Sequence, residues 1–409
     1  MRFIFYSPVA FEKWCWRNSV EKGIGGAETS HVEMAWRIAA RGHEVISYVP
    51  LPDDIASGTY WRGTQWFRLE DVDTTIDGWW ILYRCPEFVD RFLPRQRDQI
   101  LNLMMQDWDY QTWTPARVEA LDRIVVLCQA HEQWLLQRHP EFAGKTWVTR
   151  NGIKTDLIEE IAPWEQYESS YCNWKKRLKT DIVRDPHRIM YASSPDRGLL
   201  AALKIFKRAR EFVPDLSLHI TYGFNNLDKL IANGAKHFGR MKDESLKLID
   251  ETGAILHGRL SQNELYREWL KTAMTVYCTT FFETGWITGL EAQALGAIPI
   301  FSPIYAQGEN TKHGIPIEGH PDDPMTIARF AAEVVRVALH PEWAESIRGP
   351  MMADVQAKWG WDHFAEQWIK TAEEDFDGRK AVSEVRQAPV SGAVESKLEP
   401  CVAIADLVP

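Results

Sequence analysis

The sequence predicts an α/β protein with two doubly wound parallel-sheet domains that face a shared cleft. Its 409 residues exceed one ordinary hydrophobic core and suit two domains of about 150–200 residues each. Patterns of buried strands alternate with helical patterns, as in chains of βαβ units. The alternation stops after residue 153 and restarts near residue 188, which indicates a second domain of the same type.

The first half contains one well-marked βαβ unit. Residues 2–6 form an apolar run typical of a buried strand, and a long loop leads from it to a glycine cluster. A helical pattern then spans residues 27–41 and ends at Gly42, before a second apolar strand at residues 43–50. Such a unit requires parallel strands and a right-handed crossover. Further strands are expected at residues 78–84, 100–106, 123–128 and 146–153, with a helix at residues 129–138.

The second half repeats this architecture after a connecting segment. Residues 156–186 lack periodicity and are rich in charges and aromatic side chains, so we expect them to join the two domains. Strands are expected at residues 188–194, 216–223, 254–260, 274–280 and 297–302, and helices at residues 198–212, 262–273, 288–295 and 326–339. These patterns predict domains at residues 1–155 and 187–355, a late helix at 360–376 that crosses back onto the first domain, and a disordered tail at 377–409.

Composition narrows the class of protein. A net charge of −10 argues against a nucleic-acid partner, which would need a basic footprint. One basic run at residues 173–188 is a candidate contact with an anionic membrane surface, although such runs more often form a solvated helix face. The six cysteines are scattered without a C-x-x-C pair, which favours a reducing cytoplasm. No segment approaches a membrane span or a signal peptide, so we expect a cytoplasmic protein, with peripheral contact at the inner membrane face as an option.

The first candidate site is the sequence GIGGAE at residues 23–28. Gly25 and Gly26 allow close backbone approach to a ligand, and the following helix N-terminus offers free N–H groups that suit a phosphate. The sequence matches neither the dinucleotide fingerprint nor the Walker pattern with its lysine. Taken alone, it is more often a turn that packs a helix on a sheet.

The second candidate site holds two carboxylates. Glu283 follows an apolar strand and Glu291 lies about one turn into the next helix, with seven residues between them. Open α/β sheets bind ligands outside the carboxyl ends of their strands, where this segment is expected. Each carboxylate can accept two hydroxyl groups, so the pair can hold a sugar and a ribose. Gly285 permits close approach, and the backbone N–H groups of Trp286, Ile287 and Thr288 can face a diphosphate.

A third candidate is Arg197, in the sequence ASSPDRGL at residues 192–199. It lies at the first strand-to-helix turn of the second domain, where a guanidinium can form a bidentate pair with phosphate oxygens. An isolated arginine is more often a surface cation. Its expected place at a cleft shared by two parallel sheets favours the phosphate-binding interpretation.

Together, these motifs resemble the retaining glycosyltransferases of the GT-B fold, specifically the large family 4. The resemblance covers roughly residues 1–376, and it is closest to bacterial members that build cell-surface polysaccharides. It is carried by the Gly25-Gly26 pair, the RNGI segment at 150–153, Glu283 with Glu291, and the segments SSPDRGL, HGRLSQNEL and LEAQALGAIP.

The resemblance implies two Rossmann-like domains, with the acceptor on the first and the nucleotide sugar on the second. Glu291 would bind the ribose hydroxyls, Glu283 the transferred sugar and Arg197 the diphosphate, while Gly26 would let the first domain close on the distal phosphate. The donor would be a UDP-, GDP- or ADP-sugar. The resemblance further implies a metal-independent hexosyltransferase without a permanent cofactor, acting on a glycan or lipid-linked acceptor.

Two positions depart from the family pattern. The family commonly has a further arginine where Ser193 or Ser194 stands here. It also often has a histidine near the sugar, where this chain has Gln106 and Asp107, and Asp107 is our candidate catalytic residue at that place.

Other features have less specific interpretations. The D-x-D pattern at residues 71–73 would hold a metal in another transferase fold, but it falls in a polar connection. Trp14 and Trp16 suit either stacking on acceptor sugar rings or packing. Two rival functions stay open: a nucleotide-sugar epimerase of the same architecture, and a non-catalytic nucleotide-sugar-binding protein.

Overall fold

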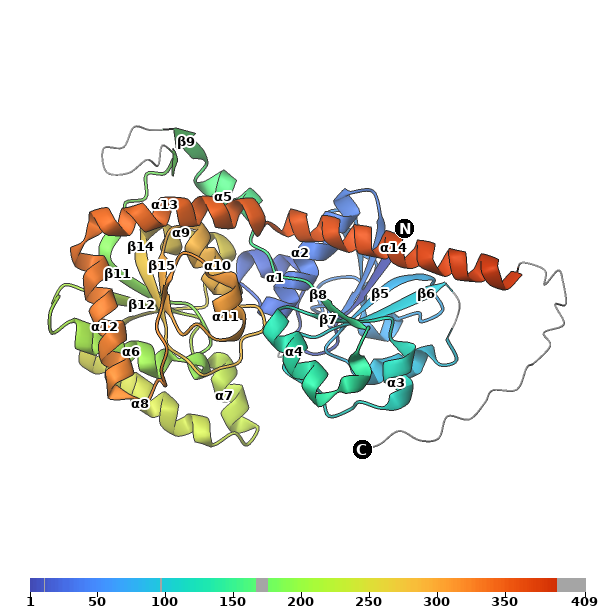
Figure 1. Cartoon of the computed structure of the whole chain (residues 1–409), viewed down its shortest axis with the longest axis horizontal. Coiled ribbons are helices and arrows are strands. Elements are labelled where there is room, and N and C mark those ends of the chain that lie inside the picture. Colours follow the sequence, from blue (N-terminus) through green and yellow to red (C-terminus); the bar gives the residue numbers. More distant parts are fainter. Residues whose placement is uncertain (11, 96–97, 167–175, 388–409) are drawn as a thin grey trace, which may run out of the picture. The chain divides into compact units, whose positions relative to one another are not determined.

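The computed structural model describes residues 1–10, 12–95, 98–166 and 176–387. Two parallel sheets lie within one compact unit, Met1–Ile369, and residues from Lys370 onward form a second unit. The predicted fold class, two doubly wound α/β domains, is therefore confirmed (Figure 1). We call the part that carries the first sheet (residues 1–155) the first domain, and the part that carries the second sheet (residues 187–355) the second domain.

The first sheet has eight strands in the order β3-β4-β2-β1-β5-β6-β7-β8. All neighbours are parallel except β3 and β4, which are antiparallel. Its central strands are largely apolar because both faces are covered. Ile4 faces the core that also contains Trp80, whereas Phe5 packs against His31 on the opposite face. The strands are β1 (Arg2–Tyr6), β2 (Glu44–Val49), β3 (Thr59–Trp61), β4 (Thr64–Arg68), β5 (Gly78–Tyr83), β6 (Gln99–Met104), β7 (Arg123–Val126) and β8 (Thr146–Val148).

Helices cover both faces of the first sheet. Those on the Phe5 side include α2 and the beginning of α14, whose Trp368 stacks on Phe5 and donates a hydrogen bond to Thr149 (2.9 Å). The chain therefore returns to the first sheet after completing the second. The helices are α1 (Trp16–Glu21), α2 (Gly26–Ala40), α3 (Pro115–Ala120), α4 (Gln129–Arg138) and α14 (Trp361–Gln387), with 3₁₀ turns at Leu69–Asp71, Pro86–Phe92 and Pro140–Phe142.

The second sheet has six parallel strands in the order β13-β12-β11-β14-β15-β16. Alternate residues of its central strand supply two cores: Ile189 and Tyr191 belong to one, Met190 and Ala192 to the other. This two-sided burial explains the unbroken apolar run that the sequence shows there. The strands are β11 (Asp185–Tyr191), β12 (Ser217–Thr221), β13 (Ile255–Gly258), β14 (Thr272–Tyr277), β15 (Ile298–Phe301) and β16 (Ile315–Pro316).

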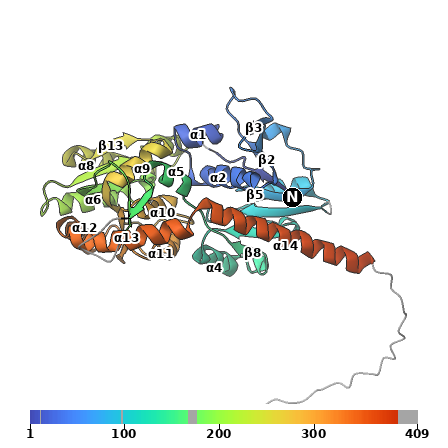
Figure 2. The ribbon, with the colours of Figure 1, turned by 90° about the horizontal axis from the view of Figure 1, so that it is seen from above.

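The helices of the second domain form two layers. The core with Ile189 draws on α6, α8 and α12, and the core with Met190 draws on α9, α10 and α13. Across the cleft, α1 of the first domain contacts α9 (Figure 2). The helices are α6 (Leu199–Ala209), α7 (Asn225–Ala232), α8 (His237–Thr252), α9 (Gln262–Lys271), α10 (Ile287–Ala294), α11 (Tyr305–Asn310), α12 (Pro324–Leu339) and α13 (Pro341–Lys358), with a 3₁₀ turn at Pro195–Arg197.

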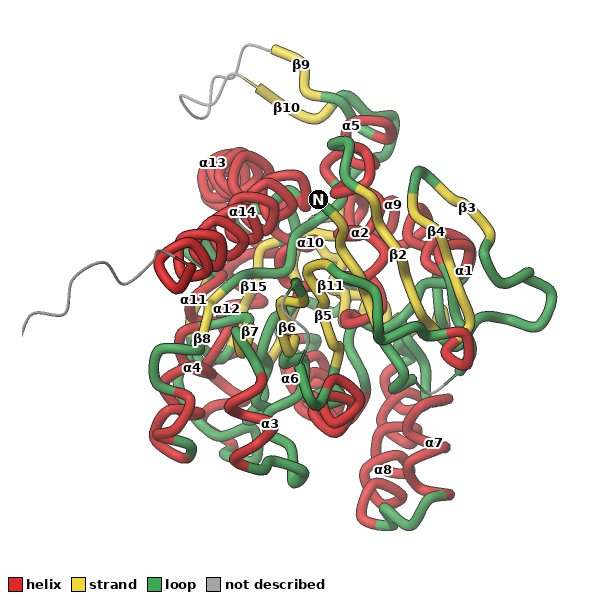
Figure 3. Tube along the Cα trace, turned by 90° about the vertical axis from the view of Figure 1, so that its right-hand side faces the viewer, coloured by secondary structure: helices red, strands yellow, loops and turns green. Residues whose placement is uncertain are grey.

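Several elements were not expected from the sequence. The hairpin of β3 and β4 turns through Arg62 and Gly63, both at positive φ, and extends the first sheet. Helices α1, α7, α8, α11 and α13 also lie in segments to which no element had been assigned. The connection contains α5 (Thr155–Ile161) and the antiparallel pair β9 (Trp164–Gln166) and β10 (Lys176–Leu178), which lies apart from both sheets (Figure 3).

The predicted tail begins later than expected, and one residue of the predicted basic run is directed inward. Helix α14 continues to Gln387 instead of ending near residue 376, and residues 388–409 lie outside the described residues. Within the basic run, Lys175 also lies outside them. Arg184 is directed into the protein, where it donates to the carbonyl groups of Trp269, Thr272 and Leu295, so it cannot contact a membrane. Among the described residues, no helix is long and apolar enough to cross a bilayer.

Candidate active site

A cavity of about 280 Å³ lies where the carboxyl ends of strands from both sheets meet. Its lining includes residues that follow β5, β6, β11, β12, β13 and β14. Parallel sheets bind ligands at this edge because loops and helix N-termini converge there. The cavity wall contains all ten residues that the sequence singled out: Gly25, Gly26, Asp107, Arg197, Glu283, Gly285, Trp286, Ile287, Thr288 and Glu291.

Glu283 is held in a fixed position at the cavity wall. Its carboxylate accepts hydrogen bonds from Arg197 Nη1 (3.0 and 3.2 Å to its two oxygens) and from the Tyr277 hydroxyl. The side chain is almost fully buried, at 7% exposure, whereas that of Arg197 is 37% exposed. The arginine therefore keeps access to a ligand while it orients the carboxylate.

The Phe281 ring and the turn at Gly198 hold Arg197 in place. It belongs to the 3₁₀ turn after β11, and its guanidinium lies over the Phe281 ring, 4.4 Å from the ring centre. Gly198 follows at φ 125°, where a Cβ would meet the carbonyl oxygen of Cys278 at 2.6 Å. The glycine thus lets the turn lie directly on the end of β14, which brings Arg197 within reach of Glu283.

Helix α10 directs its N-terminus at the cavity. Trp286 adopts a left-handed backbone conformation (φ 41°, ψ 55°) immediately before the helix, and its ring stacks on Tyr277. Such a conformation costs a large side chain about 1–3 kcal/mol and persists only where packing imposes it. Helix α10 begins directly after Trp286. The backbone N–H groups of Ile287 and Thr288 therefore lie at its N-terminal end, which favours anions.

Glu291 lies deeper, with 4% of its surface exposed. One carboxylate oxygen accepts a hydrogen bond from Gln262 Nε2 (2.6 Å). Burial raises the pKa of Glu291 to about 7, an effect that the hydrogen bond from Gln262 and the charge of Lys154 only partly offset. The carboxyl group therefore changes charge near neutral pH, next to the space that a ligand would occupy.

Replacing Glu291 with glutamine should stabilise the protein in a pH-dependent way. The pKa of this carboxyl rises from 4.5 to about 7 on folding, so folding opposes ionisation. The wild type therefore loses stability, by up to about 3 kcal/mol, as pH rises from 4.5 through 7, while the glutamine variant does not. We expect the melting temperature of Glu291→Gln to exceed that of the wild type by a margin that grows from pH 5 to pH 8. An equal margin at both pH values would contradict this account of Glu291.

The glycine-rich loop brings the first domain close to the second. A Cβ on Gly26 would contact the Ile287 side chain at 3.4 Å, and one on Gly23 would meet the carbonyl oxygen of Leu260 at 2.8 Å. Gly23 also needs its positive φ of 66°. Glycine is therefore required at position 23, because the two domains approach each other closely there. Helix α2 begins three residues later, at Gly26.

The two departures from the family pattern also lie at the cavity. Asp107 is exposed in its wall, and Gln106 beside it has an Nε2 group that is buried without a hydrogen-bond partner. The carbonyl oxygen of Gln106 accepts a hydrogen bond from Thr284 (3.1 Å), which joins the two domains next to Glu283. Ser193 approaches the Tyr277 hydroxyl at 3.4 Å. Gln106 and Ser193 therefore offer hydrogen-bond donors at these two places, and Asp107 offers an acceptor.

Sequence reasoning missed several residues of the cavity wall. Arg84 follows β5 and pairs with Glu28 (2.7 Å), and Arg259 follows β13 and pairs with Glu12 across the cleft. Tyr222 follows β12 at φ 86°. Each is among the last residues of a strand predicted from the sequence, so the rule that ligands bind at carboxyl ends of strands could have found it.

The D-x-D pattern at residues 71–73 lies outside the cavity wall, and Trp14 packs against neighbouring side chains. Asp71 accepts a hydrogen bond from Ser57, and Asp73 accepts two from Thr75, outside the cavity wall. Trp14 is buried against His31 while it reaches the cavity edge.

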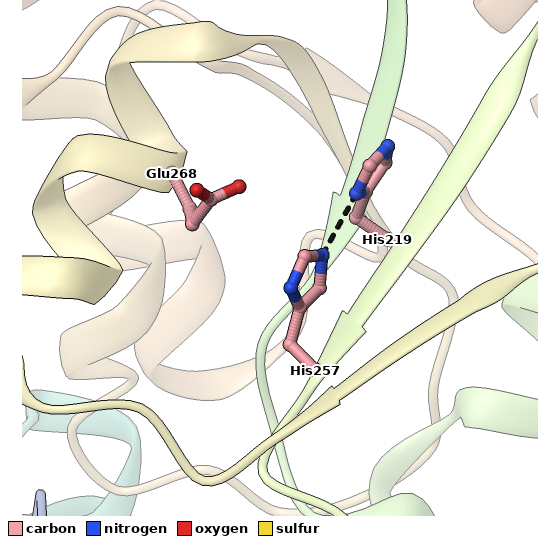
Figure 4. Close-up of side chains that lie close together, drawn as sticks. All are labelled: His219, His257 and Glu268. Atoms are coloured by element: carbon pink, nitrogen blue, oxygen red, sulfur yellow. Dashed lines mark hydrogen bonds between the residues drawn. The ribbon is translucent and has the colours of Figure 1, made fainter.

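A cluster of metal-binding residue types lies in the second domain. His219 Nδ1 and His257 Nε2 are 2.8 Å apart, and Glu268 faces them (Figure 4). Glu268 already binds Arg188 and Lys271, and these two cations oppose a further positive ion. Burial lowers the pKa of His219 to about 4, which keeps its ring neutral. The histidine pair therefore joins β12 to β13, and Glu268 joins α9 to Arg188 of β11.

Comparison with solved structures identifies the architecture. The chain is similar to a sucrose-phosphate synthase from Thermosynechococcus elongatus (14% identity, TM-score 0.63, covering 92% of this chain and 99% of that one). It is also similar to a glycosyltransferase from Rickettsia africae (12%, 0.64, 91% and 98%) and to HepE from Anabaena in complex with UDP and glucose (11%, 0.59, 91% and 100%). No protein-family model and no curated protein matches the chain. Its fold is thus that of the GT-B glycosyltransferases.

Proposed function

We propose that this protein is a glycosyltransferase that takes a sugar from a nucleotide-diphosphate donor bound in the cavity. The observation that carries the proposal is the convergence of Glu283, Arg197, the α10 N-terminus and Glu291 on one cavity. Two acidic groups suited to hydroxyls flank a cation and free N–H groups suited to phosphates. A structural neighbour, HepE, is described in complex with UDP and glucose, which supports a donor of this kind.

Each residue has a proposed part in holding the donor. Glu291 binds the ribose hydroxyls, and Glu283 binds hydroxyls of the transferred sugar. Arg197 and the backbone N–H groups of Ile287 and Thr288 bind the diphosphate. Gly26, where a Cβ would meet the Ile287 side chain, lets the first domain close over the phosphates.

Transfer then breaks the bond between the sugar C1 and the diphosphate oxygen, and a bond forms from C1 to an acceptor oxygen. The acceptor proton passes to the leaving phosphate oxygen. Negative charge gathers on the diphosphate as the bond breaks, and Arg197 and the helix N-terminus are placed to stabilise it without reorganisation. Attack from the face that the diphosphate leaves would retain the configuration at C1.

The resemblance to family 4 extends the proposal. We infer that the transferred group is a hexose, that Asp107 acts near the sugar, and that the acceptor is a glycan or lipid-linked glycan of a cell-surface polysaccharide. Because Arg197 and the α10 dipole face the phosphates, we further expect that transfer needs no divalent ion. A chelator should then leave the rate unchanged.

A thermal-shift screen tests the proposal. A ligand that binds only the folded state raises the melting temperature. One UDP-, GDP- or ADP-sugar should therefore raise it by a few degrees, and more than the unrelated nucleoside diphosphates do. The same donor should release nucleoside diphosphate when incubated with the protein, because water can take the place of the acceptor and receive the sugar. An epimerised sugar, or binding without any turnover, would overturn the transferase proposal, and so would no shift with any nucleotide sugar.

A further inference from the structure

A carboxylate of the second domain caps a helix of the first. Glu309, in α11, accepts hydrogen bonds from the backbone N–H groups of Gln129 (2.9 Å) and Ala130 (2.7 Å), the first two residues of α4. The N-cap residue of that helix, Cys128, has only a thiol, which is a weaker acceptor than a carboxylate. An anion at a helix N-terminus is stabilised both by free N–H groups and by the helix dipole.

Arg150 completes this contact. Its Nη2 group donates to Glu309 (2.7 Å), and its Nη1 group donates to the carbonyl oxygen of Leu127 (2.7 Å), directly before α4. The side chains of Arg150 and Glu309 are only 20% and 21% exposed. Charge-assisted hydrogen bonds that are shielded from water in this way are stronger than surface ion pairs.

The same short helix is bound to the donor-binding loop. The backbone N–H of Ala306 donates to the carbonyl oxygen of Glu283 (3.2 Å), and Asn310 Nδ2 donates to that of Gly285 (2.9 Å). The Tyr305 ring contacts Phe282, which in turn contacts Trp108 of the first domain. Helix α11 therefore touches the loop that carries Glu283 on one side and the first domain on the other.

We propose that Glu309 is a positioning residue that couples the two halves of the active site. By fixing α11 on the N-terminus of α4, it sets Glu283 and Gly285 in register with the acceptor-side residues Gln106 and Asp107. Glu309 does not line the cavity, so it acts on the alignment of the domains and not on the donor itself. This inference rests on the proposed function.

Glu309→Gln tests this role with little change in shape. The amide places an N–H group against N–H donors, so at least one of the three hydrogen bonds is lost. We expect the rate of nucleoside diphosphate release at saturating donor to fall by about tenfold or more, since small misalignments of reacting groups are costly. The dissociation constant of the donor should stay near that of the wild type. Glu211→Gln, which removes an exposed partner of Arg208, is the matched control and should change neither.

A double variant and a scattering measurement complete the test. If both residues act through one contact, Glu309→Gln combined with Arg150→Ala should lose no more than the worse single variant. Small-angle X-ray scattering should show a larger radius of gyration for Glu309→Gln than for the wild type. A wild-type rate in Glu309→Gln, or a donor affinity that falls as much as the rate, would overturn the inference. If the wild type binds no nucleotide sugar, the proposed function fails, and scattering alone then decides whether Glu309 holds the domains together.

Discussion

Replacing Arg197 with alanine should lower the rate of nucleoside diphosphate release by roughly 100- to 1,000-fold at saturating donor, the effect of removing one preorganised group that stabilises transition-state charge. Arg197 is the cation that bonds directly to Glu283 (3.0 Å), so its loss removes the proposed phosphate ligand and, among the described residues, leaves the buried carboxylate with the Tyr277 hydroxyl alone. Steady-state kinetics across donor concentrations measures the effect. The loss should appear mainly in kcat, because the diphosphate, which is already charged in the donor, gains a further negative charge as the bond breaks.

Two further variants serve as controls for the Arg197→Ala measurement. Arg197→Lys keeps the charge but cannot make the same planar contacts, so its rate should fall between those of the wild type and the alanine variant. Arg208→Ala removes an exposed arginine of α6 that pairs with Glu211, away from the cavity, and should leave the rate unchanged. Near-normal kcat in Arg197→Ala would show that other groups hold the leaving diphosphate.

Replacing Glu291 with alanine should weaken donor binding by roughly 10- to 100-fold, the range expected when hydrogen bonds to a charged group are lost. The carboxylate is buried and is hydrogen-bonded to Gln262 and Tyr266, and a carboxylate has about four acceptor sites, so those that remain can take the ribose hydroxyls. Isothermal titration of the variant with the nucleotide sugar that stabilises the wild type would measure the change.

A modified ligand separates this role from general damage. The 2′,3′-dideoxy form of the nucleotide lacks the hydroxyls that Glu291 is proposed to bind, so it should bind the wild type weakly. The same ligand should bind Glu291→Ala about as well as the normal nucleotide does, because both partners of the contact are then absent. If the variant still prefers the normal nucleotide as strongly as the wild type does, Glu291 does not bind the ribose.

The sequence was most informative where periodicity and position in a parallel sheet act together. The apolar residues of β11 and β14 are buried on both faces of the second sheet, and these two strands place Arg197 and Glu283 at one edge of it. The E-x7-E spacing follows from a loop and one helical turn, so both carboxylates face the same cavity. Strand patterns and the spacing of residues along the chain were sufficient to predict this part of the site.

What the sequence could not show depends on contacts between distant segments. Glu309 binds the N-terminus of α4 across 179 residues of sequence, and Glu12 pairs with Arg259 across 247. The raised pKa of Glu291 depends on burial by surrounding elements, which no local pattern reports. Helix α11 has only six residues and no clear periodicity, so it was overlooked although it joins the two domains.

A crystal structure of the protein with a nucleotide sugar would test the central claim most directly. The account predicts ribose hydroxyls at Glu291, the diphosphate between Arg197 and the N-terminus of α10, and the sugar at Glu283. Density for the diphosphate away from Arg197, or for a ribose that does not reach Glu291, would contradict it.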